Sequence, residues 1–214
     1  MEKEGKSKKG LIIILIVILA VILFFAMQII TQKMAVNDGI DYLADKEYEK
    51  AYQSFEKAEG KITIFTSKSN ILYYEGECLM DLERFDEAAK VYEEIDENRA
   101  LVLKGLALLQ DGQEEEAVDA YRQAIDADAE DGMAYYYLYA YYLSKDDAKT
   151  ALSVLDEAKE ANVSNMKQEI DYARIVVYEK LLKYDQALSE AESYVEAYPD
   201  DEKGQQELEF LETR

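Results

Sequence analysis

A spaced alanine motif recurs along this chain and constrains its fold more than any other feature. In the first four copies an alanine is followed four residues later by an aromatic residue or leucine, and three residues after that usually by another alanine. The leading alanines are 37, 29, 34 and 36 residues apart, and the copies are Ala51/Phe55/Ala58, Ala88/Tyr92/Ile95, Ala117/Tyr121/Ala124, Ala151/Leu155/Ala158 and the weaker Ala187/Ala191/Tyr194. A period of this length predicts stacked repeats.

Glycines stand twelve residues before the first three leading alanines, at Gly39, Gly76 and Gly105. Together with the alanine motif they resemble the tetratricopeptide repeat (TPR), a 34-residue helix-turn-helix unit. The resemblance covers roughly residues 32–201. It places the glycines at consensus position 8, where a small residue lets the two helices approach closely. It places Pro199 at position 32 of the last copy, and Tyr42, Leu79, Leu108, Tyr142 and Tyr178 at position 11.

The copies also depart from the family pattern. Position 8 is Tyr139 and Ile175 in the last two copies, and the fifth copy exchanges its large and small partners. The 29-residue spacing predicts a shortened connection around "IDENRA", and the surplus around "EGKITIFTS" predicts a longer loop or an extended helix. Position 7 is charged in four copies, at Asp38, Glu75, Lys104 and Arg174.

Composition agrees with an all-α chain, because it contains one proline and nine glycines in 214 residues and is rich in good helix formers. The formal charge of −22 makes nucleic acid and anionic lipid headgroups unfavourable ligands for the folded part. We therefore expect no nucleic-acid partner.

An apolar segment occupies residues 11–30, "LIIILIVILAVILFFAMQII". Twenty residues rising about 1.5 Å each span about 30 Å, the thickness of the hydrocarbon core of a bilayer. A cleaved signal peptide would have a shorter apolar stretch and a small-x-small cleavage site, which "AMQIITQKM" does not offer, so an uncleaved transmembrane anchor is the prediction. No break follows Ile30, so we expect the anchor to continue into the first repeat helix.

The charges beside this segment predict its orientation. Residues 1–10 carry Lys3, Lys6, Lys8 and Lys9, whereas only Lys33 follows closely behind the span. The positive-inside rule then leaves a basic tail in the cytoplasm. The repeats would lie outside the cytoplasmic (plasma) membrane, on a single-pass protein. The expected organisation is a tail at 1–10, an anchor at 11–30, a solenoid of about five repeats at 31–201 and a C-terminal capping helix at 202–214.

Residue types exclude most chemistry. The chain has no histidine and one cysteine, which removes His-based catalysis and Cys/His zinc clusters. Cys78 is either a reactive thiol or a buried one, and its helical surroundings favour the buried thiol. The "DADAEDG" stretch fails as a calcium loop because Asp131 and Tyr137 stand where glycine and glutamate are needed. We expect no enzyme, no metal and no cofactor.

The resemblance also implies a binding surface, since positions 5, 9 and 12 line the concave groove in proteins of this family. These positions are mostly large and apolar here, which favours an apolar peptide or amphipathic helix as ligand, with basic flanking residues facing the acidic rim. The candidate groove residues are Tyr73, Met80, Val102, Leu106, Leu109, Tyr136, Leu143, Tyr172 and Val176.

The tyrosine-rich stretch "YYYLYAYY" contributes one residue to this candidate groove, Tyr136. This stretch comprises residues 135–142. The resemblance to the repeat family assigns Tyr135, Tyr139, Tyr141 and Tyr142 to packing and predicts that Tyr137 faces outward.

The leading hypothesis is a membrane-anchored adaptor or scaffold for an unknown protein or peptide partner. One alternative is a structural protein whose solenoids self-assemble into homo-oligomers. Another keeps the fold but turns the repeats toward the cytosol, as in proteins that resemble organelle import receptors.

Overall fold

The computed structural model describes residues 2–61 and 67–214, with side chains from Ile12 onward. Every regular element in these residues is a helix, which confirms the all-α prediction. The chain divides into two compact units, Met1–Asp96 and Glu97–Arg214. Their boundary falls inside "IDENRA", where the shortest spacing predicts an irregular connection. The segment 31–201, expected as one solenoid, contains this boundary.

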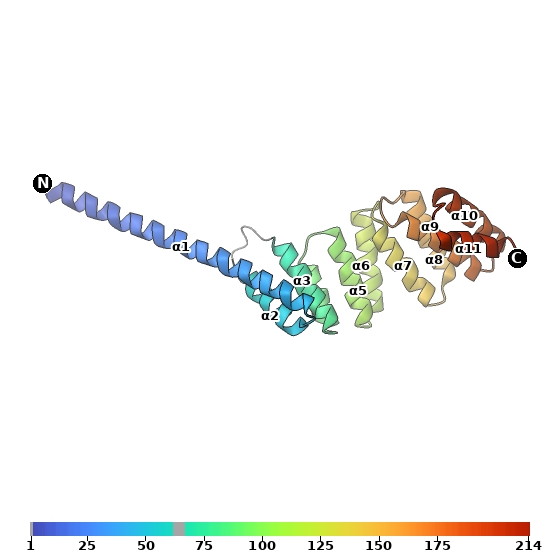
Figure 1. Cartoon of the computed structure of the whole chain (residues 1–214), viewed down its shortest axis with the longest axis horizontal. Coiled ribbons are helices and arrows are strands. Elements are labelled where there is room, and N and C mark those ends of the chain that lie inside the picture. The colour runs from blue at the N-terminus through green and yellow to red at the C-terminus, as the bar shows by residue number, and fades with distance from the viewer. Residues whose placement is uncertain (1, 62–66) are drawn as a thin grey trace. The chain divides into compact units, whose positions relative to one another are not determined.

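The first unit contains four helices in its described part (Figure 1): α1 (Glu2–Ala44), α2 (Tyr48–Glu59), α3 (Lys68–Asp81) and α4 (Phe85–Glu93). Each packs against the next along the chain. The apolar segment and the first repeat helix are one uninterrupted helix, as predicted. Residues 62–66 of the surplus connection lie outside the described residues.

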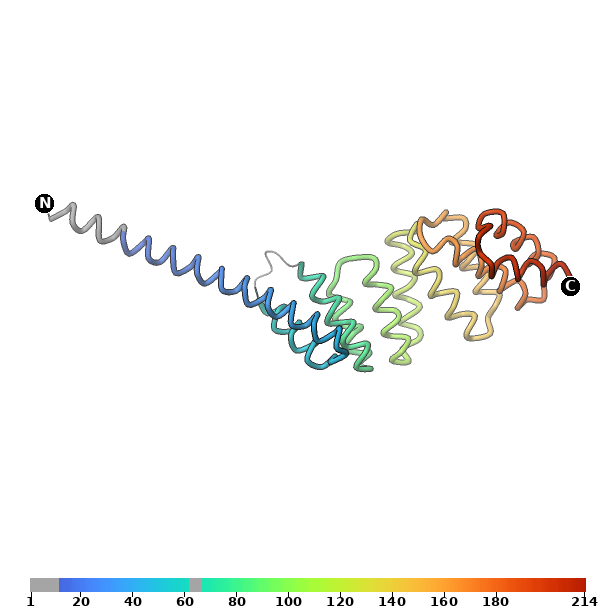
Figure 2. Tube along the Cα trace, viewed as in Figure 1, coloured from blue at the N-terminus to red at the C-terminus, as the bar shows by residue number. Residues whose placement is uncertain are grey.

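The second unit contains α5 (Asn98–Gln110), α6 (Glu114–Ala127), α7 (Gly132–Ser144), α8 (Ala148–Ala161), α9 (Lys167–Lys180), α10 (Tyr184–Ala197) and α11 (Glu202–Leu211). Successive helices pack against each other, and α7 also contacts both α5 and α9. The first helices of successive repeats therefore lie side by side, and α11 follows α10 as a short final helix (Figure 2).

Each turn between the two helices of a repeat closes in the same way. One residue adopts a left-handed conformation, at Lys46, Glu83, Gly112, Asp146 and Leu182. The backbone N–H of this residue and that of the next residue donate to carbonyls of the preceding helix, as in the Schellman motif. In the fifth copy Lys183 N donates to the Tyr178 carbonyl at 2.9 Å. In each turn, one of the two hydrogen bonds reaches back five residues. The carbonyls that accept it belong to the position 11 residues Tyr42, Leu79, Leu108, Tyr142 and Tyr178.

The position 8 glycines bring their helix against an aromatic ring of the second helix. A Cβ added at Gly39 would lie 2.7 Å from ring carbons of Phe55, and one added at Gly105 would lie 2.5 Å from Cε1 of Tyr121. Both distances are too short for non-bonded carbons. The rings themselves are fully buried. Glycine is thus required by the ring that faces it.

The last copy uses the opposite arrangement, as predicted. Ile175 on α9 is large, and it lies in one buried cluster with Ala187 and Ala191 of α10. The aromatic ring moves to Tyr194, and a Cβ added at Gly204 of α11 would collide with that ring. This contact fixes the capping helix on the last repeat.

Glu75, one of the charged position 7 residues, lies at the packed face of α3. Its side chain is 4% exposed and its Oε1 atom has no hydrogen-bond partner. Burial, together with the negative charges of Glu59, Glu56 and Glu94, raises its pKa from 4.5 to about 7. The charge of Lys68 opposes this shift, but burial and the three neighbouring carboxylates outweigh it.

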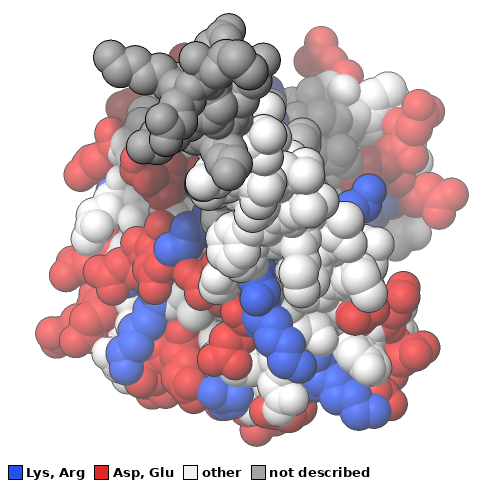
Figure 3. All heavy atoms as spheres, turned by 90° about the vertical axis from the view of Figure 1, so that its left-hand side faces the viewer, with Lys and Arg blue, Asp and Glu red and all other residues white. Residues whose placement is uncertain are grey.

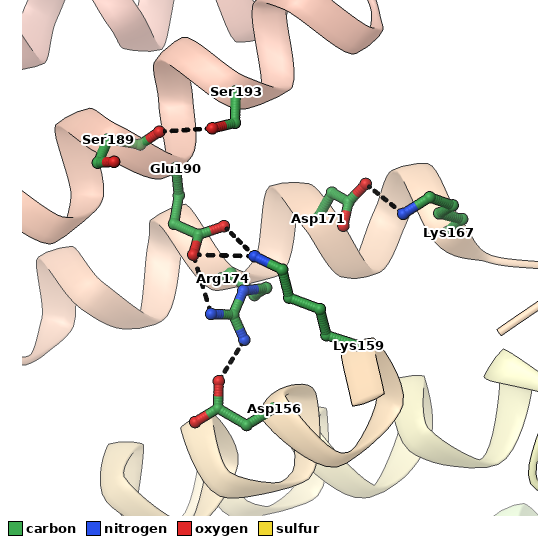
Figure 4. Close-up of polar contacts among 8 residues, drawn as sticks. All are labelled: Asp156, Lys159, Lys167, Asp171, Arg174, Ser189, Glu190 and Ser193. Atoms are coloured by element: carbon green, nitrogen blue, oxygen red, sulfur yellow. Dashed lines mark hydrogen bonds and ion pairs between the residues drawn. The ribbon is translucent and has the colours of Figure 1, made fainter. Parts of the chain in front are cut away.

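Arg174 of α9 is buried as well, but it is paired (Figure 4). Its guanidinium binds Asp156 of α8 and donates to Glu190 of α10 at 2.9 Å. Lys159 of α8 reaches the same Glu190 carboxylate at 3.3 Å. Burial opposes ionisation of Glu190, but the hydrogen bonds and charge of Arg174 lower its pKa below 4.5. Three helices are therefore cross-linked through one cation.

We predict that Gly105→Ala lowers the free energy of unfolding by about 1–3 kcal/mol, because the new methyl group overpacks the Tyr121 ring. Denaturant unfolding of the full chain in detergent measures this. Gly60→Ala is the control, since its nearest heavy atom would lie at 3.8 Å. Equal effects of the two substitutions would contradict the close-approach argument.

Glu75→Gln should change the pH dependence of stability. Because the folded-state pKa of about 7 exceeds the ordinary 4.5, the unfolded chain binds fewer protons between these values. Wild-type stability falls as pH rises through this window. The stability of the variant relative to wild type should therefore rise by about 2 kcal/mol between pH 5 and pH 8. Glu77→Gln, an exposed neighbour on α3, should show no such difference between the two pH values.

Candidate functional site

The nine candidate groove residues all lie on the first helices of their repeats. Tyr73 and Met80 lie on α3 in the first unit; α5, α7 and α9 of the second unit carry Val102, Leu106, Leu109, Tyr136, Leu143, Tyr172 and Val176. Eight of the nine are half-buried. Val102 is 0% exposed, so it contributes no surface to a groove, contrary to the expectation from its helical position.

Three of these residues meet in one cleft of the second unit. Tyr136 of α7 and Tyr172 and Val176 of α9 line a cavity of about 410 Å³. Ala173 lines it as well. The helices α7 and α9 contact each other, and both contribute residues to the lining of this cleft. Leu106, Leu109 and Leu143 are half-buried but do not line it.

Four tyrosines line one part of the cleft: Tyr136, Tyr139, Tyr172 and Tyr194. Tyr139 lies edge-to-face with Tyr136 at 5.2 Å between ring centroids, and Tyr194 does the same with Tyr172 at 5.5 Å. Burial raises the pKa of Tyr139 to about 12, and burial with the nearby Glu207 raises that of Tyr172 to about 12. These phenols stay neutral at physiological pH.

The other wall of the cleft is polar and comes from the start of α9 and of α11. Gln168 donates to the Tyr194 hydroxyl at 3.0 Å and to Asp201 at 2.8 Å. Asp201 also caps α11 by accepting from Lys203 N at 2.9 Å. The Lys203 ammonium lies 4.0 Å from the centroid of the Tyr172 ring, within the range of a cation–π contact.

Sequence reasoning missed this polar half. It assigned Tyr139 to packing, whereas Tyr139 lines the cleft. It expected Tyr137 to face outward, whereas Tyr137 stacks on buried Tyr121 at 6.2 Å. The assignment of Tyr135 to the core is confirmed, since this residue is buried. The sequence pattern did not predict a role for Asp201 and Lys203 in the cleft, because only the docking of α11 brings them to α9.

Cys78 is buried in the core of the first unit together with Val36 and Phe55. Burial, with the charges of Glu77 and Asp81, raises its pKa to about 12. The predicted buried thiol is confirmed. The described part of the chain contains no group of three or more His, Cys, Asp or Glu residues placed to hold a metal ion.

Helix α1 is long and apolar enough to cross a membrane, or to be a signal sequence, by its length and composition. Its side chains from Ile12 to Phe25 are exposed. Further along, Gln32 is buried and donates to the Ala58 carbonyl of α2 at 3.4 Å. Val36 belongs to the core of the first unit. One helix therefore contains an unpartnered apolar part and a part packed into the repeat.

One face of the molecule is rich in acidic side chains. Asp and Glu side chains cover much of the face shown in Figure 3, with Lys and Arg side chains among them. This distribution agrees with the formal charge of −22.

Comparisons with known proteins support the repeat assignment. A TPR repeat-containing protein of Methanocaldococcus jannaschii is 28% identical over 141 residues, which cover 63% of this chain and 24% of that protein. The chain therefore spans about a quarter of this relative's length. No protein-family model matches the chain.

Solved structures give the same result for the fold. MamA from Desulfovibrio magneticus has a TM-score of 0.60 at 16% identity, covering 80% of this chain and 97% of that one. A TPR protein from Thermus thermophilus has a TM-score of 0.54 at 15% identity, covering 86% and 100%. YrrB, a TPR protein described as having an unusual peptide-binding site, has 0.54 at 18%, covering 80% and 89%. The chain has the tetratricopeptide repeat fold.

Proposed function

We propose that this chain is a membrane-anchored, non-catalytic scaffold whose TPR-fold domain binds a segment of a partner protein. The observation that carries the proposal is the cleft between α7 and α9, where Tyr136, Tyr172 and Val176 of successive first helices converge. Concave clefts of this volume that combine apolar rings with a few polar groups suit side chains of a bound peptide. The half-buried Leu106, Leu109 and Leu143 supply further apolar surface on the same set of helices.

The continuity of α1 supports a membrane anchor. A signal peptidase cleaves an accessible segment that follows the apolar stretch. Here the residues after that stretch remain helical to Ala44, and Gln32 and Val36 are already buried. This arrangement favours an uncleaved span at residues 11–30, with residues 1–10 in the cytoplasm and the repeats outside.

Site-specific photo-crosslinking in cells tests the scaffold role. We expect p-benzoylphenylalanine at Tyr136 or Leu106 to form adducts with one other protein. The same group at Ser153, an exposed residue of α8, should not form them. Adducts of the chain with itself would favour the alternative of a self-assembling structural protein. Equal labelling at all three positions would contradict a binding surface on the first helices.

Cysteine labelling tests the orientation. Gln186→Cys places an exposed thiol on α10, and we expect a membrane-impermeant maleimide to label it in intact cells. Ser7→Cys should react only after permeabilisation. Wild type is the matched control, because its single cysteine, Cys78, is buried. Labelling of Ser7→Cys alone in intact cells would reverse the topology and support a cytosol-facing receptor.

A further inference from the structure

The cleft between α7, α9 and α11 already holds one positive charge, the side chain of Lys203. Its ammonium lies 4.0 Å from the Tyr172 ring centroid. Lys203 is exposed and stands in the first turn of α11. Its stem is flexible, and a contact of this kind is individually weak. A second cation could therefore replace it without unfolding the cleft.

The walls of the cleft suit a cation better than an anion. The faces of tyrosine rings attract positive charge, and Tyr136, Tyr139 and Tyr172 all contribute rings to the lining. The residues that line the cleft also include two carboxylic acids, Glu169 and Asp201. The charge of −22 over the whole chain adds long-range attraction for a basic partner.

The position of Asp201 is fixed by other contacts. Its carboxylate accepts hydrogen bonds from Gln168 at 2.8 Å and from the Tyr194 hydroxyl, and it caps α11 through Lys203 N. An incoming cation would meet a carboxylate held in place before binding, which reduces the ordering cost of association.

We propose that this cleft binds a lysine or arginine side chain of the partner segment, which takes the place over the Tyr172 ring that Lys203 occupies in the free protein. The inference deepens the scaffold proposal and rests on it. It also names the partner chemistry: an apolar segment that presents a basic side chain at the cleft.

Two probe peptides test this inference with the full chain in zwitterionic lipid nanodiscs. Both are the same fluorescein-labelled twelve-residue peptide of Leu, Ala and Ser, one with a central lysine and one with norleucine in its place. Fluorescence anisotropy measures their dissociation constants, with empty nanodiscs as the blank. We expect wild type to prefer the lysine peptide by about threefold.

The variants assign that preference to the cleft. Lys203→Gln should raise the preference for lysine to about tenfold, because the internal competitor is gone. Tyr172→Leu should remove the preference. If this substitution unfolds the site, Tyr136→Leu serves as the second variant, and it should weaken the preference. Lys145→Gln is the matched control, since it makes the same charge change at a lysine 5.6 Å from the Tyr141 ring outside the cleft.

Each outcome decides the inference. Equal affinities for the two peptides in wild type and in Lys203→Gln overturn the cation site but leave the scaffold proposal intact, provided the Tyr136 crosslink to a partner forms. An equal gain in Lys145→Gln also overturns it, because the effect is then one of net charge. Binding of neither peptide, with no partner crosslink at Tyr136, overturns both proposals.

Discussion

The first three repeats depend on one contact, in which a glycine of the first helix lies directly against a buried aromatic ring of the second helix. Where Gly105 faces Tyr121, the space that a methyl group would need is already filled by the ring. Burying a ring of this size contributes about 1.5–3 kcal/mol relative to leaving it exposed. That gain is available only if the backbone of the first helix comes close enough to exclude water from the ring, and glycine permits this approach.

The same constraint explains why so much of the fold could be predicted from the sequence. A glycine and an aromatic residue sixteen positions apart identify a helix pair, and the position 11 residue marks where the turn closes. Tyr178 shows that this register extends to the fifth copy, because its carbonyl accepts the turn hydrogen bond from Lys183 N. This register holds although Ile175 stands where the first three copies have glycine and Ala191 stands where they have an aromatic residue.

The site was less predictable for two physical reasons. The position of a residue in a helix predicts the direction of its side chain but not how deeply neighbouring helices cover it. Val102 therefore stands at a groove position of the repeat and is nevertheless buried. The polar half of the cleft comes from α11, whose placement depends on the packing of Gly204 against Tyr194. That contact joins the last repeat to a helix outside the repeats, so the repeat pattern does not predict it.

The charged position 7 residues show two ways of keeping an ionisable group inside a repeat. Arg174 remains charged because Asp156 and Glu190 neutralise it, whereas Glu75 has acidic neighbours and takes up a proton more readily. Both groups resist burial in their charged form unless they are paired. Their placement at packed helix faces makes the stability of each unit sensitive to charge, while the cleft relies on neutral rings.

Helix α1 connects this packing to the proposed topology. The residues that follow the apolar segment, from Gln32 onward, complete the core of the first repeat, so no flexible linker separates the span from the solenoid. Between Ile30 and Ala44 the helix rises only about 20 Å at 1.5 Å per residue. A partner bound to the half-buried Tyr73 or Met80 of the first unit would therefore be held close to the bilayer surface, at a height fixed by a helix rather than by a tether.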